Sequence, residues 1–178
     1  MKSIELIYSM KINLILLFCI SILFSCNVEK EKEPAYLRYI GDIEFDPEID
    51  DPDFKLCYYE SSVFQYFSFS SLETFVGEKE AIDDYFKENY KPVDINESGW
   101  IRIRFIVNCN GETGRFRMIE SDEDYKERPF NTKISSQLMA LTKSLEGWQG
   151  FENEEHSLDY YQYLVFKINN GAIEQILP

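Results

Sequence analysis

Few residues of this chain are of the types that carry out catalysis. His156 is the only histidine, and it stands among acids in the stretch ENEEHSLD, where an imidazole is usually solvated. The sequence contains no Cys-x-x-Cys, no Gly-x-Ser-x-Gly and no phosphate-binding loop, and acid pairs such as Glu154-Glu155 are too common in it to be informative. We therefore predict a protein that is not an enzyme, with no catalytic residue, no cofactor and no metal site.

Acidic residues dominate the charge of the chain. Its 178 residues carry a net charge of −14, and no basic cluster offsets it, which argues against a nucleic-acid partner. The stretch DPEIDDPD at 46–53 invites a calcium interpretation, but Asp51 stands where an EF-hand needs glycine and Cys57 where it needs glutamate. We interpret this stretch as a solvated acidic loop.

The N-terminus has the pattern of an export signal. Lys11 precedes an apolar run from Ile12 to Phe24, which is shorter than the roughly 20 residues of a membrane-spanning helix. The residues LFSC that end at Cys26 resemble a bacterial lipobox. This resemblance implies a signal peptide at 1–25, acyl chains on Cys26, a tether at 26–35 and a location at the outer membrane of a bacterial envelope. An ordinary signal or an uncleaved anchor is the alternative.

Export changes the meaning of the remaining cysteines. Cys19 leaves with the signal and Cys26 is lipidated, so Cys57 and Cys109 are left as free partners in an oxidising compartment. A disulfide between them would stabilise the fold by about 4 kcal/mol in the chain-entropy model. Two separate buried thiols are the alternative, because the sequence does not show whether their Cβ atoms meet.

Two segments have the spacing of amphipathic helices. In GEKEAIDDYFKENYKP one face is apolar and Pro92 ends the helix; in NTKISSQLMALTKSLEG, Asn131 or Thr132 caps the start and Gly147 suits the end. The apolar faces are Ile82, Tyr85, Phe86 and Tyr90 in the first segment, and Ile134, Leu138, Leu141 and Leu145 in the second.

Strand patterns surround these helices. Apolar residues alternate in WIRIRFIVNCNGETGRFRMIE (100–120), which we expect to form a hairpin in the middle of a sheet, turning at Asn110-Gly111. A second hairpin turns at Asn170-Gly171 and ends in a strand at 172–177, and the aromatic segment 54–69 holds one or two further strands. The order predicts an α+β fold, an antiparallel sheet with two helices on one face.

Four arginines lie on the first hairpin. Arg102 and Arg104 alternate with its apolar row, and Arg115 and Arg117 lie on the returning strand. One interpretation is a solvated sheet face whose arginines pair with local acids. The other is a basic strip that binds an acidic peptide or a phosphate group.

The order of motifs from Phe75 onward resembles the C-terminal domain of TonB, in the relatives that carry a Phe-x-Gly-Gly motif. The resemblance covers about 100 residues, 75–178, and leaves 36–74 outside as an aromatic-rich extension. The matching residues are Phe75 and Gly77 with Glu78 in place of the second glycine, Asn89-Tyr90-Lys91-Pro92, GWIRIRFIVNCNG at 99–111, Trp148-Gln149-Gly150, Phe166 and Ile168.

The resemblance implies a binding module that accepts a strand of an outer-membrane or periplasmic protein at its sheet edge. Because this chain has a lipid anchor in place of a spanning helix and lacks a long Pro-rich spacer, we expect an accessory lipoprotein. The expected contact residues are Arg102, Arg104, Ile173, Glu174, Gln175 and Ile176. The alternatives are a small-ligand-binding lipoprotein with Tyr58–Phe69 as its pocket wall, or an envelope hydrolase that uses His156 or an acid pair.

Overall fold

The computed structural model describes residues 43–65, 73–152 and 157–177. The chain divides into two units, 1–40 and Gly41–Pro178, and every described residue belongs to the second. The predicted signal peptide, the tether, Cys26 and His156 therefore lie outside the described residues. Within the described ranges, no helix combines the length and the apolar content needed to cross a membrane.

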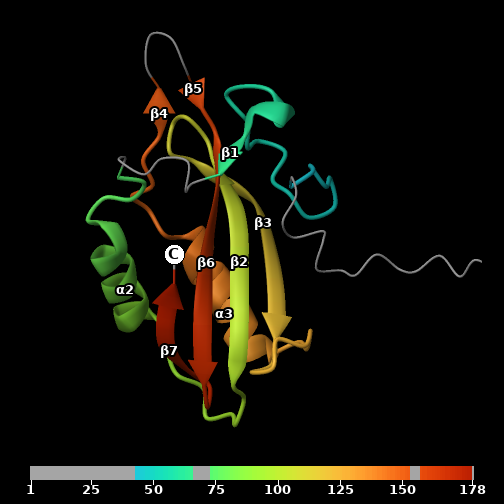
Figure 1. Cartoon of the computed structure of the whole chain (residues 1–178), viewed down its shortest axis with the longest axis vertical. Helices are drawn as coiled ribbons and strands as arrows, with labels where there is room; N and C mark the ends of the chain where they lie inside the picture. The colour runs from blue at the N-terminus through green and yellow to red at the C-terminus, as the bar shows by residue number, and fades with distance from the viewer. Residues whose placement is uncertain (1–42, 66–72, 153–156, 178) are drawn as a thin grey trace, which may run out of the picture. The chain divides into compact units, whose positions relative to one another are not determined.

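The second unit is built on one five-stranded sheet (Figure 1). Its strands are β1 (Phe64–Gln65), β2 (Gly99–Val107), β3 (Thr113–Ser121), β6 (Tyr160–Asn169) and β7 (Ala172–Leu177). The order is β1-β6-β2-β3, and β7 also pairs with β6. A separate two-stranded sheet joins β4 (Phe151–Glu152) to β5 (Ser157–Leu158).

The sheet differs from the predicted one in two ways. It is mixed rather than antiparallel, because β1 pairs in parallel with the start of β6, while β7 pairs antiparallel with its far end. The first hairpin is also not central: β3 forms an edge, and β2 and β6 are the middle strands. The partner of β2 on its other side comes from the end of the chain, which strand periodicity alone does not specify.

Both helices lie close to their predicted positions. The first, α2 (Glu78–Asn89), has Tyr90 as its C-cap. The second, α3 (Thr132–Lys143), begins after Asn131, whose side chain accepts a hydrogen bond from the Lys133 amide at 3.0 Å. These short-range signals work because capping and periodicity act within one or two turns. Gly147 does not end α3, which stops at Lys143.

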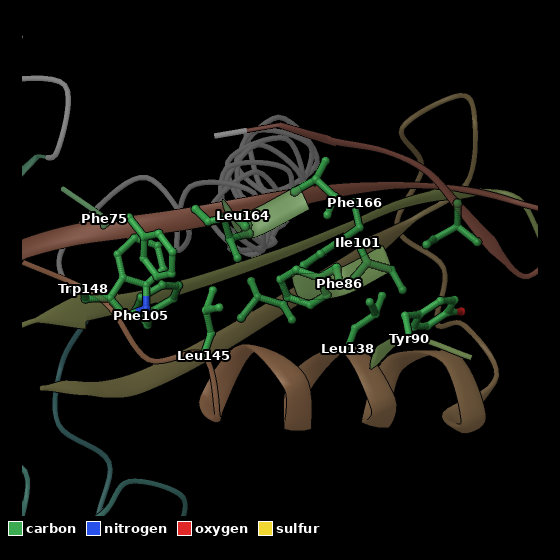
Figure 2. Packing of buried hydrophobic residues seen from close by; sticks show 14 of the residues in the cluster. Phe75, Phe86, Tyr90, Ile101, Phe105, Leu138, Leu145, Trp148, Leu164 and Phe166 are labelled. Atoms are coloured by element: carbon green, nitrogen blue, oxygen red, sulfur yellow. The ribbon is translucent and has the colours of Figure 1, made fainter. Parts of the chain in front are cut away.

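One hydrophobic core lies between the two helices and one face of the sheet, here called the inner face (Figure 2). The alternating row Ile101, Ile103, Phe105 and Val107 of β2 is fully buried in it. Phe86 of α2 meets Phe166 of β6 edge to face, with ring centroids 4.8 Å apart. The structure thus confirms the α+β class, with a mostly antiparallel sheet and two helices.

The described N-terminal part of this unit, residues 43–65, crosses the opposite face of the sheet, and we call it the strap. It contains one 3-10 turn, η2 (Glu60–Ser62), and ends in β1. Its apolar side chains form a second cluster with Ile106 and Tyr161, which point away from the helices. The strap members of this cluster are Ile43, Phe54, Leu56 and Val63.

Candidate functional site

Two of the four hairpin arginines, Arg115 and Arg117, hold the strap. Arg115 donates to both oxygens of Glu60 at 2.6 Å and to the carbonyl of Ile43 at 3.1 Å. Arg117 donates to both oxygens of Asp50, at 2.6 and 2.7 Å. These two arginines therefore pair with acids, as in the interpretation of a sheet face whose arginines pair with local acids. The acids come from the strap and not from neighbouring strands.

Arg104, which was expected to bind a partner, is buried. Only 6% of it is exposed, and its guanidinium lies 4.3 Å from the ring centroid of Tyr161. Arg102 is half-buried, and no ion pair of Arg102 is found among the described residues. It lies level with Val165 of β6, so one strand separates it from β7. The sequence did not show the burial of Arg104, because the alternation of polar and apolar residues does not report what lies against the polar face of a strand.

The ion pairs of the strap shift the acidity of its carboxyl groups. Burial raises the pKa of Asp50, but hydrogen bonds from Arg117 and from the Asp46 amide outweigh it, and the pKa is lower than usual. The hydrogen bond from Arg115 holds the pKa of Glu60 below its ordinary value. Both carboxylates are therefore charged at neutral pH and stabilise the position of the strap.

A covalent and hydrogen-bonded joint fixes the strap to the sheet. The sulfurs of Cys57 and Cys109 are 2.13 Å apart, at disulfide distance, and their Cα atoms are 6.0 Å apart. Asp159, which is fully buried, accepts hydrogen bonds from the amides of Cys57 and Tyr58 at 3.0 Å and of Cys109 at 3.1 Å. The Asp159 carboxylate thus satisfies backbone donors on both sides of the sulfur pair. The sequence carries no signal for this role of Asp159.

The described surface has a groove of about 420 Å³ between α2 and β7. Its buried floor contains Phe86, Tyr90 and Ile176. The predicted contact residues Ile173, Glu174, Gln175 and Ile176 all line it, together with the polar residues Lys79, Asp83 and Lys87 of α2. Sequence reasoning missed the three α2 residues, although their i, i+4, i+8 spacing beside the apolar face was a signal for them.

Among the described residues, β7 pairs only with β6, so its other side is an open edge. Asn170 and Gly171 have φ of 50° and 74°, which indicates a two-residue hairpin turn with hydrogen bonds between Asn169 and Ala172. In an antiparallel pair the next residue, here Ile173, points its amide and carbonyl away from the partner strand. The backbone of Ile173 therefore faces the open edge.

The opposite edge of the sheet, β3, is less suited to accept a strand. Arg115 has a φ of 54° there, and the β2–β3 register shifts between Arg104 and Ile106. Such bulges and charged inward side chains are devices by which proteins protect an edge from pairing. The β6–β7 register also shifts, because Glu174 of β7 lies between the residues that pair with Lys167 and Ile168 of β6. On both sides of Glu174, β7 remains paired with β6.

Most charges around the groove are already paired. Lys79 forms an ion pair with Asp83 one turn along α2, and Glu174 forms one with Lys167 at 2.8 Å. Lys87 also lines the groove, and no ion pair of Lys87 is found within the described ranges. The groove therefore offers an unpaired cation above an apolar floor, in a chain whose net charge is −14.

Comparison of the chain with protein-family models, with curated proteins and with solved structures found no match.

Proposed function

We propose that this chain is a lipid-anchored protein of a bacterial envelope whose TonB-C-like domain binds a protein partner without catalysis. In this proposal an extended segment of the partner adds to β7. The observation that carries it is the open edge of β7 beside the α2–β7 groove. An open strand edge supplies backbone hydrogen bonds to an incoming strand, and a neighbouring groove receives its alternate side chains.

Contacts between distant motif residues support the TonB-C-like part of the proposal. Phe75 and Trp148 form an isolated bridge, and their rings meet edge to face at 4.8 Å. The buried hydroxyl of Tyr90 donates to the carbonyl of Gly171 at 2.9 Å, which ties the end of α2 to the turn before β7. Gly77 and Glu78, at the two glycine positions of the motif, both have left-handed φ, 79° and 53°.

The geometry of the groove suggests how a segment is held. The amide and carbonyl of Ile173 bond to its backbone, and every second side chain then points toward Phe86 and Tyr90. Since no ion pair of Lys87 is found among the described residues, an acidic side chain next to the apolar one fits best. Arg102 lies beyond β6, so it is not part of this site.

Site-specific photocrosslinking tests the β7 edge in the intact envelope. With p-benzoylphenylalanine in place of Gln175, which is exposed at the groove, we expect a discrete adduct with an envelope protein. The same group in place of Ser136, which is exposed on α3, should give none. Equal adducts from both positions, or none from Gln175, would refute binding at this edge.

A matched pair of substitutions separates backbone pairing from packing. Ile173→Pro removes the amide that faces the open edge, whereas Ile173→Val keeps it and loses one methylene. We expect the Gln175 adduct to disappear with proline and to persist with valine. If the folded proline variant still gives the adduct, the partner does not bind by strand addition.

The lipid anchor has its own test, because Cys26 lies outside the described residues. Cys26→Ala should abolish labelling with a radioactive fatty acid and release the protein from the membrane fraction. Unchanged labelling would remove the lipoprotein part of the proposal and leave the β7 edge untouched.

A small apolar ligand is the second candidate occupant of the groove. Its volume of about 420 Å³ falls within the range of roughly 300–1,000 Å³ that is typical of ligand sites. Tyr58–Phe69 was expected to form the pocket wall, and its described part, 58–65, does not line this groove. A small ligand would leave hydrogen exchange of the Ile173 amide unchanged, whereas an added strand would slow it.

A further inference from the structure

Exposed apolar side chains are concentrated on the strap. Of the seven large apolar residues that are exposed among the described residues, five belong to this 23-residue segment. They are Phe45 (45% exposed), Ile49 (60%), Tyr58 (58%), Tyr59 (70%) and Phe64 (43%). The strap already packs four other apolar side chains on the sheet, so the exposed ones are not needed for its attachment. Clustered exposed apolar groups of this kind mark interaction sites.

The central pair, Tyr58 and Tyr59, is held in place by its surroundings. Its backbone follows the Cys57–Cys109 joint directly, and the Tyr58 amide is bound by Asp159. The two rings meet edge to face with centroids 4.7 Å apart. A surface that is fixed before binding loses little conformational entropy when a partner arrives.

A further aromatic residue lies near this pair. The guanidinium of Arg115 is 5.6 Å from the ring centroid of Phe45, and the same group binds Glu60, the neighbour of Tyr59 in the chain. Phe45 and Tyr59 therefore belong to neighbouring parts of one surface, joined by the Arg115–Glu60 pair.

The same surface is strongly acidic. The strap contains seven acids and one base, Lys55, and Arg115 and Arg117 neutralise only Glu60 and Asp50. No ion pair is found in the described ranges for the other five acids, which are Glu44, Asp46, Glu48, Asp51 and Asp53. Excess negative charge disfavours an anionic membrane or a nucleic acid, and it attracts a cationic surface.

We propose that the strap is a second binding surface, for a basic protein partner rich in arginine and lysine. The partner's cations lie over the rings of Tyr58 and Tyr59 and pair with exposed acids such as Glu48 and Asp53. Charge complementarity selects this partner over a lipid surface or a second copy of the chain. The surface lies on the strap, away from β7, and it requires neither strand addition nor the lipid on Cys26.

The proposal is tested with two synthetic peptides and the full chain. In one peptide arginine alternates with leucine, and in the other glutamate replaces every arginine. We expect only the arginine peptide to bind, with an affinity that falls as salt is raised. The double variant Tyr58→Ser/Tyr59→Ser should weaken binding by about tenfold, through lost cation–π contacts.

The loop that carries Tyr125 supplies matched controls, because this tyrosine is 72% exposed and follows Glu123 and Asp124. Tyr125→Ser should leave binding unchanged. The reversal Glu48→Lys/Asp53→Lys should abolish it, and Glu123→Lys/Asp124→Lys should not. All these residues are exposed, so the variants should fold, which thermal unfolding checks.

Three results would overturn the inference. The first is an equal loss from both charge reversals, which would show general attraction to an acidic chain. The second is full binding by the tyrosine double variant. The third is that Tyr58 and Tyr59 serve another occupant of the surface. In that case the protein would bind phosphatidylcholine vesicles, or self-associate in sedimentation, and the tyrosine double variant would not. Ile173→Pro should bind the arginine peptide normally, so failure at β7 is distinguishable from failure here.

Discussion

The buried carboxylate of Asp159 offers the sharpest test of how the strap is attached. Asp159→Asn keeps the size of the side chain but replaces one oxygen acceptor by an NH2 donor. In the protein, Oδ1 accepts from the amides of Cys57 and Cys109, and Oδ2 accepts from those of Cys57 and Tyr58. Whichever way the Asn amide turns, either Tyr58 or Cys109 loses its acceptor.

The expected cost follows from these bonds. A buried amide without an acceptor costs about 1–3 kcal/mol, and the bonds that remain lose their charge assistance, about 1 kcal/mol more. The free energy of unfolding should therefore fall by about 2–4 kcal/mol. For a unit of this size, we expect Tm to fall by about 10 °C. The substitution also removes a buried negative charge, which by itself would raise the free energy of unfolding. This gain is small, because three amide donors already stabilise the carboxylate.

Chemical denaturation of the oxidised protein measures this loss, and amide hydrogen exchange locates it. Exchange should accelerate at Cys57, Tyr58 and Cys109 and not in α3. Asp124→Asn, at a carboxylate whose side chain is 81% exposed, is the control and should change stability by less than about 0.5 kcal/mol. An Asp159→Asn protein as stable as the parent would mean that burying the charge costs as much as its bonds contribute, and the reasoning above would be refuted.

Three further predictions concern α2 and the strap. Glu78→Gly should leave the free energy of unfolding unchanged or raise it, because Glu78 has a φ of 53°, which glycine adopts without strain. Glu80→Gly in the same helical turn should lower the free energy of unfolding by about 1 kcal/mol, and urea denaturation of the two variants should show this difference. Because the pKa values of Asp50 and Glu60 are lowered, their ion pairs stabilise the strap fully above about pH 5, and this stabilisation is lost as the pH falls below about 4. Protection of the strap amides, taken relative to the intrinsic exchange rate at each pH, should fall in acid, and unchanged protection would contradict the prediction. Phe86→Ala should cost about 3–5 kcal/mol by calorimetry and weaken occupation of the groove, since the ring is fully buried beneath it; a cost below about 1 kcal/mol would argue against this packing.

The strap and the α2–β7 groove depend on different kinds of sequence feature. Around the groove, the contacts connect elements whose own patterns are strong: the apolar face of α2 and the hairpin that ends in β7. The strap holds only the two-residue strand β1 and one 3-10 turn, and its attachment depends on single residues, Asp50, Cys57 and Glu60, that meet partners on the sheet. Single substitutions should therefore detach the strap more readily than they disturb the groove.

Local patterns in the sequence were sufficient for the helices, for β2 and for the last hairpin. The α2 and α3 faces, the cap at Asn131 and the turn at Asn170-Gly171 all depend on residues within a few positions of one another. The prediction that Ile173 to Ile176 form an accessible strand belongs to the same class, because it needed only the turn and the alternation that follows it.

Only the tertiary structure decided what the arginines, the cysteines and Asp159 do. Arg115 meets Glu60 across 55 positions, and Asp159 meets the Cys57 amide across 102. Arg104 was expected on a solvated face because its alternation with apolar residues is that of an exposed strand, but it is buried and lies over the ring of Tyr161 of β6. The groove likewise exists only because α2 packs beside β7. Periodicity reports which face of an element is apolar, and it does not report which distant segment will cover the other face.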